Sequence, residues 1–486
     1  MTYPSSSAQN PLSLTKERGQ GVRWGVVCWL ASDTILSMKK TSKAVKATPN
    51  TEVSKEKSYL VTGGVALRGE VTVPGAKNAA SKELVASLLA DTPVTLENVP
   101  LIGEIDLTIE LLQGLGADVK RRGHRVTVDG SKMQTSQVSA SFSRKNRIPI
   151  LLLGPLLHRF GEAVIPALGG DAIGARPVNF HMDALEKMGA TIQHEEGVYI
   201  AKAARLQGTV IELPYPSVMA TENVMLCAVK AKGTTVIKNA AVEPEIVDLA
   251  MLLQAMGAII YQDVNRSWII EGVEHLHGAT HRVIPDRIVA ASFAVAAVIT
   301  KGDVFVKDAR QVDLLSFLNN LRRIGVTYEI KEDGIRFIGT GELKPIALET
   351  DVHPGFMTDW QQPFVVLLTQ ADGVSIVHET VYEDRFGYTE ALRKMGAKIQ
   401  LHRECLGAKD CRFRDRDYKH SGIIVGPTSL KAATINVPDI RAGFSYLLAA
   451  LIANGTSTLT GVDHLERGYE DLIGKMQSLG AKIQVK

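Results

Sequence analysis

A pattern of helix, glycine and strand recurs six times along the chain. In each copy a stretch of helical periodicity ends in an apolar residue, a glycine and a small residue, and a strand of alternating apolar and polar positions follows. The glycines lie about 70 residues apart, at Gly116, Gly189, Gly257, Gly325, Gly396 and Gly480. This regularity indicates an internal repeat in which each glycine ends a helix in a left-handed conformation.

A second strand precedes the helix in most copies. Such strands are expected at residues 94–96, 235–237, 304–306, 374–376 and 458–459. The unit is therefore strand, loop, helix, glycine and strand, which predicts an α/β (α+β) fold of six units. The last interval is the longest, and its surplus fits the charged segment 403–421, which we interpret as a surface insertion.

Composition and charge narrow the class of protein. The 486 residues are 45% hydrophobic and 22% charged, as in ordinary globular proteins, and the length suggests two to four domains. A formal net charge of +3 is too small for a nucleic-acid binder, and four cysteines do not make a disulfide framework, which favours the cytoplasm. The apolar stretch 24–32 is too short to span a bilayer. Residues 1–57 are interpreted as a disordered extension, with Met38 as a plausible alternative start.

Arginines stand at matching positions shortly before the helix in three copies. Arg176, Arg385 and Arg467 lie 11 to 13 residues before the glycine of their own copy. Each alone would ordinarily be a solvated surface residue. If the copies pack around pseudo-symmetry axes, however, the three guanidinium groups converge on one cleft and suit a phosphate.

Three other loops carry candidate chemistry. Lys77 lies between a strand that ends at Pro74-Gly75 and a helix expected to begin near Ala79, where backbone amides attract anions, although a capped helix with a surface lysine fits equally. Asp171 lies in a glycine-rich loop, which is either a plain turn or a mobile loop that delivers a proton donor. Asp359 precedes an apolar helical pattern, as a helix N-cap or as a general base.

Metal and common enzyme motifs find little support. His402, Cys405, Cys411 and His420 have the residue types of a zinc site, but their spacing matches no common zinc motif, and we predict no metal site. Motifs for dinucleotide binding, zinc proteolysis and serine hydrolysis are absent from the sequence.

Taken together, these segments resemble the UDP-N-acetylglucosamine 1-carboxyvinyltransferases, the bacterial enolpyruvyl transferases that begin peptidoglycan synthesis. The resemblance covers nearly all of residues 58–486. Its strongest stretches, in the expected order and spacing, are Pro74–Ala80, Gly169–Pro177, Glu243–Asp248, Pro285–Arg287, Asp439–Arg441 and Arg467–Glu470.

The resemblance implies an inside-out α/β barrel of two domains, with three units in each. One domain would span residues 77–285, and the other residues 58–76 plus 286–486 with the insertion 403–421. It also implies a cytoplasmic enzyme of cell-wall synthesis, and so of cell shape and division. That enzyme moves the enolpyruvyl group of phosphoenolpyruvate to the 3-hydroxyl of UDP-N-acetylglucosamine and releases phosphate by addition and elimination. No cofactor, nucleic-acid partner or membrane insertion is implied.

The resemblance further implies a role for individual positions. Catalytic roles fall on Lys77, Asp171, Asp359 and Arg441, and cleft support falls on Asp286 and Arg385. Phosphoenolpyruvate would be bound by Lys77, Asn78, Arg176, Arg441 and Arg467. The UDP-sugar would be bound by Asn78, Arg147, Arg176, Pro177, Val178, Asn179, Phe180, Ser217, Val218, Asp359 and Val381.

Two positions depart from the family pattern. Most members carry cysteine where this chain has Asp171, and some carry aspartate. Without the thiol, the epoxide antibiotic fosfomycin lacks its nucleophile, so we expect natural resistance. Tyr215 stands where the family often has a lysine, which leaves one uridine-side contact open.

Two alternative functions follow from the same residues. One is 3-phosphoshikimate 1-carboxyvinyltransferase, on the same fold, although the loops 74–80 and 170–177 favour the UDP-sugar. The other is a non-catalytic UDP-sugar-binding paralogue, which the presence of Lys77, Asp359 and Arg441 disfavours.

Overall fold

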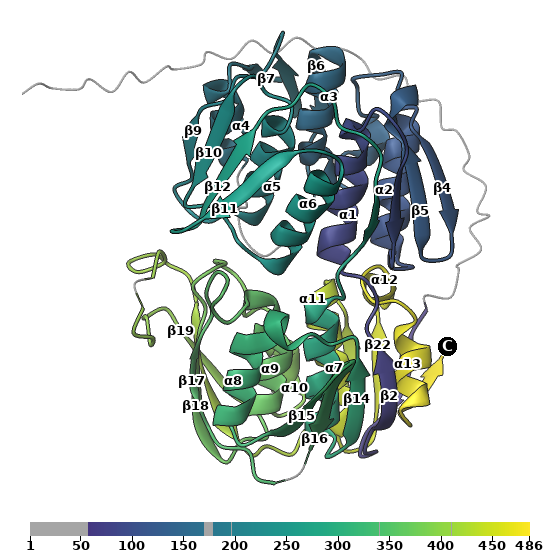
Figure 1. The fold of residues 1–486 in the computed structure, drawn as a ribbon. Helices are drawn as coiled ribbons and strands as arrows, with labels where there is room; N and C mark the ends of the chain where they lie inside the picture. The colour runs from purple at the N-terminus through teal and green to yellow at the C-terminus, as the bar shows by residue number, and fades with distance from the viewer. Residues whose placement is uncertain (1–56, 170–177, 196, 340, 410) are drawn as a thin grey trace, which may run out of the picture. The chain divides into compact units, whose positions relative to one another are not determined.

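The repeated units form small sheets that are packed on helices (Figure 1). The structure, a computed structural model, describes residues 57–169, 178–195, 197–339, 341–409 and 411–486. Nearly all of the expected N-terminal extension (residues 1–56) and three predicted site residues, Asp171, Arg176 and Pro177, lie outside this range. From residue 57 onward, the described residues form one compact unit that holds two hydrophobic cores.

The first core, called here the N-terminal lobe, draws its residues from Ala76 to Ile284. Its helices are α1 (Lys77–Ala86), α2 (Gly103–Gly114), α3 (Leu153–Phe160), α4 (Asn179–Lys187), α5 (Val218–Ala228) and α6 (Pro244–Ala255). Its strands are β3 (Val94–Glu97), β4 (Asp118–Arg122), β5 (Arg125–Asp129), β6 (Glu162–Pro166), β7 (Thr191–Glu195), β8 (Val198–Lys202), β9 (Val210–Glu212), β10 (Thr234–Lys238), β11 (Ile259–Asp263), β12 (Ser267–Glu271) and β13 (Thr280–Arg282). They pair in the orders β13-β3-β5-β4, β6-β8-β7 and β11-β12-β10-β9.

The second core, the C-terminal lobe, combines residues 59–73 with residues 289–483. Its helices are α7 (Arg287–Ile299), α8 (Leu315–Arg323), α9 (Gln361–Leu368), α10 (Thr389–Lys394), α11 (Ile440–Ile452), α12 (Asp463–Glu466) and α13 (Leu472–Ser478). Its strands are β1 (Tyr59–Thr62), β2 (Arg68–Thr72), β14 (Asp303–Lys307), β15 (Thr327–Lys331), β16 (Gly334–Ile338), β17 (Ala347–Glu349), β18 (Gly373–His378), β19 (Lys398–His402), β20 (Ser421–Gly426), β21 (Thr434–Asn436), β22 (Thr456–Thr460) and β23 (Lys482–Val485). They pair in the orders β15-β16-β14-β2, β17-β18-β20-β19 and β21-β22-β1-β23.

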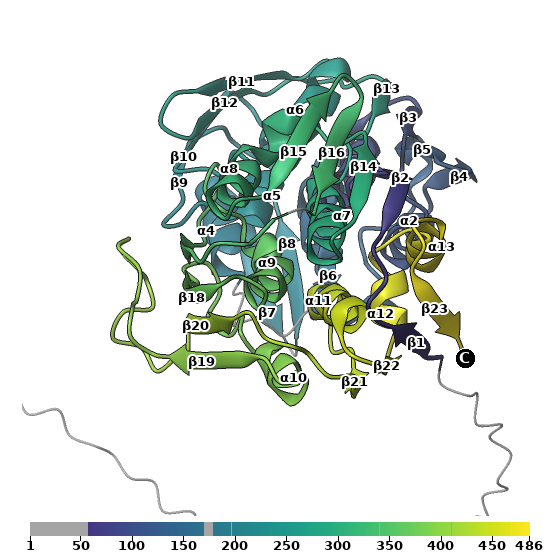
Figure 2. The same ribbon diagram turned by 90° about the horizontal axis from the view of Figure 1, so that it is seen from below.

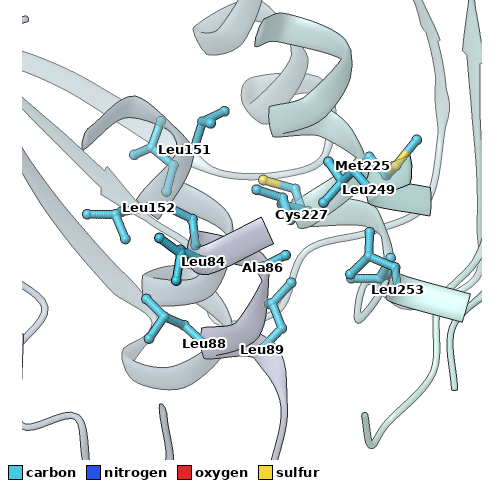
Figure 3. Close-up of a cluster of buried hydrophobic side chains, with 14 of the residues drawn as sticks. Leu84, Ala86, Leu88, Leu89, Leu151, Leu152, Met225, Cys227, Leu249 and Leu253 are labelled. Atoms are coloured by element: carbon cyan, nitrogen blue, oxygen red, sulfur yellow. The ribbon is translucent and has the colours of Figure 1, made fainter. Parts of the chain in front are cut away.

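Apolar helices lie inside each lobe and the sheets lie outside. All 13 residues of α7 are buried, as expected of a helix that is hydrophobic on every side. Figure 2 shows α7, α9 and α11 enclosed by the three sheets of their lobe. In the N-terminal lobe the side chains of α1, α5 and α6 meet in a continuous apolar cluster that includes Leu84, Met225 and Leu253 (Figure 3). The predicted inside-out α/β architecture is therefore confirmed.

The six repeat glycines behave as predicted. Each follows a helix and has a positive φ, between 90° and 102°, which a side chain at Cβ would disfavour. The expected strands are also confirmed, as β3, β10, β14, β18 and β22. The insertion lies between β19 and β20, and its last expected residue, Ser421, already belongs to β20.

The chain crosses between the lobes twice, and the two crossings run side by side. The Ala76 N–H donates to the Ile284 carbonyl (2.7 Å), and the Asp286 N–H donates to the Pro74 carbonyl (2.9 Å). Gly75 is required here, because a Cβ atom would lie 1.8 Å from the Asn98 carbonyl oxygen. Helices α1 and α7 therefore begin next to each other, and α1 starts at Lys77 rather than near Ala79.

Within the described residues, no helix combines the length and the apolar character needed to cross a membrane.

Candidate active site

A cavity of about 690 Å³ is lined by residues of both lobes. Its wall includes most of the predicted site residues that the structure describes: Lys77, Asn78, Arg147, Phe180, Ser217, Val218, Asp359, Val381, Arg385, Arg441 and Arg467. Three predicted residues within the described ranges do not line the cavity. Asp286 accepts a hydrogen bond from the Lys77 backbone N–H, and Val178 and Asn179 lie at the start of α4. Residues far apart in the sequence are thus brought to one place.

Asp359 is the carboxylate at the centre of the charged wall. It lies in a 3₁₀ turn, Thr358–Trp360, just before α9, and its side chain does not cap that helix. Instead its Oδ1 accepts a hydrogen bond from the Arg385 guanidinium (2.5 Å) and lies 3.8 Å from Arg441 Nε. The N-cap interpretation of Asp359 is therefore wrong.

The charges around Asp359 decide its protonation. Burial by itself would raise the pKa of this carboxyl, but nearby cations, led by Arg441 and Arg385, outweigh burial and hold its pKa below the ordinary value. Its side chain is 19% exposed, so a ligand in the cavity can reach it. At neutral pH Asp359 is an anion that can accept a proton.

The first turn of α11 positions Arg441. Asp439 caps the helix by accepting hydrogen bonds from the backbone N–H groups of Arg441 (2.8 Å) and Ala442 (2.9 Å). The guanidinium donates to the Tyr469 hydroxyl (3.3 Å) and lies over the same ring. The carboxylate of Asp359 keeps the pKa of Arg441 raised in spite of burial, so this cation stays charged in the wall.

Lys77 is placed by a cap shared between two helices. The Oδ1 atom of Asp286 caps α7 through the Ile288 N–H (2.8 Å), while its Oδ2 atom accepts the backbone N–H of Lys77 (3.1 Å). One carboxylate therefore fixes the N-termini of α1 and α7 at the junction of the lobes. The positive ends of the dipoles of α1 and α7 therefore meet at this junction, which favours the binding of an anion there.

Arg467 and Glu104 join the two lobes across the cavity wall. The Arg467 guanidinium donates to the Glu104 carboxylate (2.9 Å) and to the Lys145 carbonyl (3.0 Å). Glu104 also accepts a hydrogen bond from Asn146 (3.0 Å). Of the three arginines at matching repeat positions, the two that the structure describes, Arg385 and Arg467, both line this cavity.

A cavity residue that the sequence did not suggest is Arg412. It lies in the insertion, its guanidinium is 4.4 Å from the Tyr215 ring centroid, and it donates a hydrogen bond to the Val381 carbonyl. Tyr215 belongs to the N-terminal lobe and Val381 to the C-terminal lobe, so Arg412 spans both. The only signal in the sequence was the charge of the insertion, which gave no reason to select this arginine.

A buried carboxylate is paired with one of the lysines that line the cavity. Glu222 of α5 is paired with the cavity-lining Lys82 at 3.6 Å, and its side chain is almost fully buried. Burial, which outweighs Lys82, raises the pKa of Glu222 to about 7. Ionisation of Glu222 therefore costs folding free energy.

We expect Glu222→Gln to stabilise the protein at pH 8 but not at pH 4.5. The raised pKa means that the ionised carboxylate destabilises the folded state progressively as pH rises from about 4.5 to about 7, by roughly 3 kcal/mol above that range. Urea unfolding at both pH values measures the difference. Glu212→Gln, at an exposed strand position, is the control and should show no such pH dependence. An equal stability difference at both pH values would contradict the raised pKa.

Comparisons with known proteins agree on one group of enzymes. The family model described as EPSP synthase (3-phosphoshikimate 1-carboxyvinyltransferase) matches residues 61–476. A UDP-N-acetylglucosamine 1-carboxyvinyltransferase of Protochlamydia amoebophila is 51% identical and covers 87% of this chain and 93% of its own length. A UDP-N-acetylglucosamine 1-carboxyvinyltransferase 1 of Staphylococcus aureus is 41% identical, over 87% of this chain and 98% of its own length.

Solved structures are similar in fold. The enolpyruvyl transferase NikO from Streptomyces tendae superposes with a TM-score of 0.78 at 25% identity, covering 89% of this chain and 99% of its own length. An EPSP synthase from Acinetobacter baumannii has a TM-score of 0.69 at 20% identity, with 89% and 100% covered.

Proposed function

Because the chain belongs to the UDP-N-acetylglucosamine 1-carboxyvinyltransferase family, we propose that it transfers the enolpyruvyl group of phosphoenolpyruvate to the 3-hydroxyl of UDP-N-acetylglucosamine. The observation that carries the proposal is the ionised Asp359 held between Arg385 and Arg441 in a cavity shared by two lobes. In this proposal the protein works in the cytoplasm, at the start of peptidoglycan synthesis.

The cations serve the anionic substrate. Phosphoenolpyruvate carries a phosphate and a carboxylate, and Lys77, Arg441 and Arg467 bring three positive charges to the same wall. Arg441 interacts with Asp359 and Arg467 with Glu104, so an entering phosphate competes with these two carboxylates. Binding of the anion would therefore weaken the interaction between Arg441 and Asp359 when Asp359 has to act as the base.

Asp359 is the base for the sugar hydroxyl. As the 3-hydroxyl oxygen attacks C2 of phosphoenolpyruvate, its proton passes to the Asp359 carboxylate, and a proton from an acid is added to the methylene carbon. The resulting tetrahedral adduct then loses a proton from that carbon and releases phosphate, which restores the double bond. Cations next to the phosphate stabilise the charge that develops on this route.

Asp171 is the acid in this proposal. The segment that carries it lies outside the described residues, but residues close to both of its ends contact or line the cavity wall. The Gly169 N–H donates to the Asn146 carbonyl (3.0 Å), and a Cβ at Gly169 would lie 1.9 Å from the Arg144 carbonyl oxygen. Both Asn146 and Arg144 line the cavity, as does Phe180, three residues after the segment.

The deciding experiment is release of phosphate from phosphoenolpyruvate by the purified full-length chain. We expect release that depends on UDP-N-acetylglucosamine and does not occur with shikimate 3-phosphate. Release with shikimate 3-phosphate alone would support the other enolpyruvyl transferase. Binding of the UDP-sugar without any phosphate release would support the non-catalytic paralogue.

We expect Arg412→Ala to raise the KM for UDP-N-acetylglucosamine roughly fivefold, since an exposed ionic contact contributes up to about 1 kcal/mol. Arg412 supplies a positive charge beside Tyr215, where the family often has a lysine, and touches Val381 on the UDP-sugar side. Initial rates at varied UDP-sugar concentration measure the effect. The KM for phosphoenolpyruvate should be unchanged, and Arg416→Ala, an exposed arginine of the same insertion, should change neither constant. A rise in the phosphoenolpyruvate KM alone would place Arg412 elsewhere.

A further inference from the structure

Four potential metal ligands meet at one end of the sheet β17-β18-β20-β19. They are His378, Cys405, Cys411 and His420, and their ligand atoms all lie within 4.8 Å of one another. His378 is the last residue of β18, and His420 directly precedes β20, with which β18 pairs through His378 and Ser421. The two cysteines come from the insertion between β19 and β20. The fold therefore gathers the cluster from a strand and from a distant loop.

In both histidines of the cluster, the Nδ1 atom faces a neighbouring oxygen atom, which orients the ring. The Nδ1 atom of His378 lies 3.2 Å from the Glu349 carboxylate, and that of His420 lies 2.8 Å from the Tyr418 carbonyl. His420 Nε2 is 3.3 Å from Cys405 Sγ. His378 Nε2 is buried and has no hydrogen-bond partner among the described residues. Both Nε2 atoms are thus available to a metal ion.

A second layer of contacts fixes this arrangement. Glu349 accepts hydrogen bonds from the backbone N–H groups of Ala408 (2.9 Å) and Lys409 (3.1 Å) as well as facing His378. A Cβ atom at Gly407 would lie 2.1 Å from His378 Nδ1, so only glycine permits this close packing. The Phe413 N–H points at Cys411 Sγ (3.3 Å), which is the contact that a thiolate accepts. Carboxylates behind metal-bound histidines commonly orient the ring in this way.

We propose that His378, Cys405, Cys411 and His420 form a Cys₂His₂ site for a structural zinc ion. Tetrahedral bonds of about 2.0 to 2.3 Å to nitrogen and sulfur separate the ligand atoms by roughly 3.3 to 3.8 Å, and the cluster reaches this range with small adjustments. Four protein ligands leave no open position, so the ion is structural rather than catalytic. Two thiolates also balance the charge of the ion.

The proposal revises the assignment made from the sequence. By residue type, the sequence grouped His402 with Cys405, Cys411 and His420, but their spacing matched no common zinc motif and no metal site was predicted. In the structure the ligand is His378, which belongs to another strand and follows no local spacing rule. His402 pairs with Ser421 in the sheet but does not belong to the cluster. Separate substitutions of His378 and His402 therefore distinguish the proposed ligand set from one that contains His402.

A consequence follows for the active site, and this step rests on the proposed function. Cys411 directly precedes Arg412, which contacts Tyr215 and Val381 in the cavity wall. The His420 carbonyl accepts the Glu379 N–H (2.7 Å), and Glu379 in turn accepts the N–H of Val381 (2.8 Å). The ion would thus hold the insertion in the position that presents Arg412 to the UDP-sugar, and its removal should raise that KM about fivefold.

Metal analysis of the purified full-length protein tests the site directly. We expect about one zinc ion per chain, and, after reconstitution with CoCl₂ alone, the thiolate charge-transfer and intense visible bands of tetrahedral cobalt. His378→Asn and Cys411→Ser should lose at least nine-tenths of the bound metal. His402→Asn should retain it, as should Cys227→Ala, which removes a thiol buried in the other lobe.

Three other outcomes would contradict the zinc site or its assigned ligands. Protein that binds neither zinc nor cobalt, or that contains a Cys405–Cys411 disulfide after purification under air with zinc present, would overturn the proposal. Loss of metal in His402→Asn with retention in His378→Asn would overturn the assigned ligand set. Because these readouts are spectroscopic, they hold whether or not the chain releases phosphate from phosphoenolpyruvate, and an inactive protein that binds zinc would contradict only the proposed function.

Discussion

Asp359→Asn should lower kcat about a thousandfold, because a positioned general base contributes roughly 10² to 10⁴ to the rate. Asparagine keeps the shape of the side chain and its hydrogen bond with Arg385 but cannot take the proton of the sugar hydroxyl. The KM for phosphoenolpyruvate should not rise, because Arg441 loses a competing carboxylate. Steady-state phosphate release at saturating UDP-N-acetylglucosamine measures both constants.

The pH profile gives a second test of Asp359. Its pKa is held below the ordinary aspartate value of about 3.8, so its base form persists as pH falls and is lost only below that value. Asp359 should therefore not cause a loss of kcat/KM between pH 8 and pH 5.

For the Asp359→Asn variant, the matched control is Asp384→Asn, at an exposed neighbour of Arg385, which should keep wild-type activity. Activity of Asp359→Asn within tenfold of wild type would remove Asp359 from the role of base.

Asp171→Ala should abolish phosphate release, while Asp171→Cys should retain it and make the enzyme sensitive to fosfomycin. Both aspartic acid and cysteine can donate a proton, but only the thiolate is a good nucleophile toward an epoxide. In the cysteine variant the sulfur opens the epoxide ring, a C–S bond forms, and the ring oxygen takes up a proton. Mass spectrometry of the intact protein would detect the adduct, and progress curves would show time-dependent inactivation.

Wild-type protein treated identically is the control and should carry no adduct. A covalent adduct on Asp171 itself, or inhibition of the wild type at the potency usual for cysteine enzymes, would contradict the expected resistance. Substantial activity in Asp171→Ala would show that another group protonates the methylene carbon. Each of these results concerns the acid alone and leaves the assignment of Asp359 untouched.

The repeat could be predicted in detail because it depends on local physics. Helix periodicity, strand alternation and a glycine at the end of each helix are properties of a few consecutive residues. The structure therefore bears out strands such as β3 and β14 and the left-handed glycines. The start of α1 was two residues in error, because the cap that begins it comes from Asp286, more than two hundred residues away.

The sequence by itself determined the six units, the residue types of the loops and the family to which the chain belongs. Only the tertiary structure decided which side chains meet. For Asp359 the sequence allowed either a helix cap or a general base, and only the tertiary structure brings Arg385 and Arg441 beside it. His378 joined two cysteines and His420 through strand pairing, and Arg412 reached the cavity through the same insertion. Such partners are selected by the packing of distant segments, and no spacing rule along the chain encodes that packing.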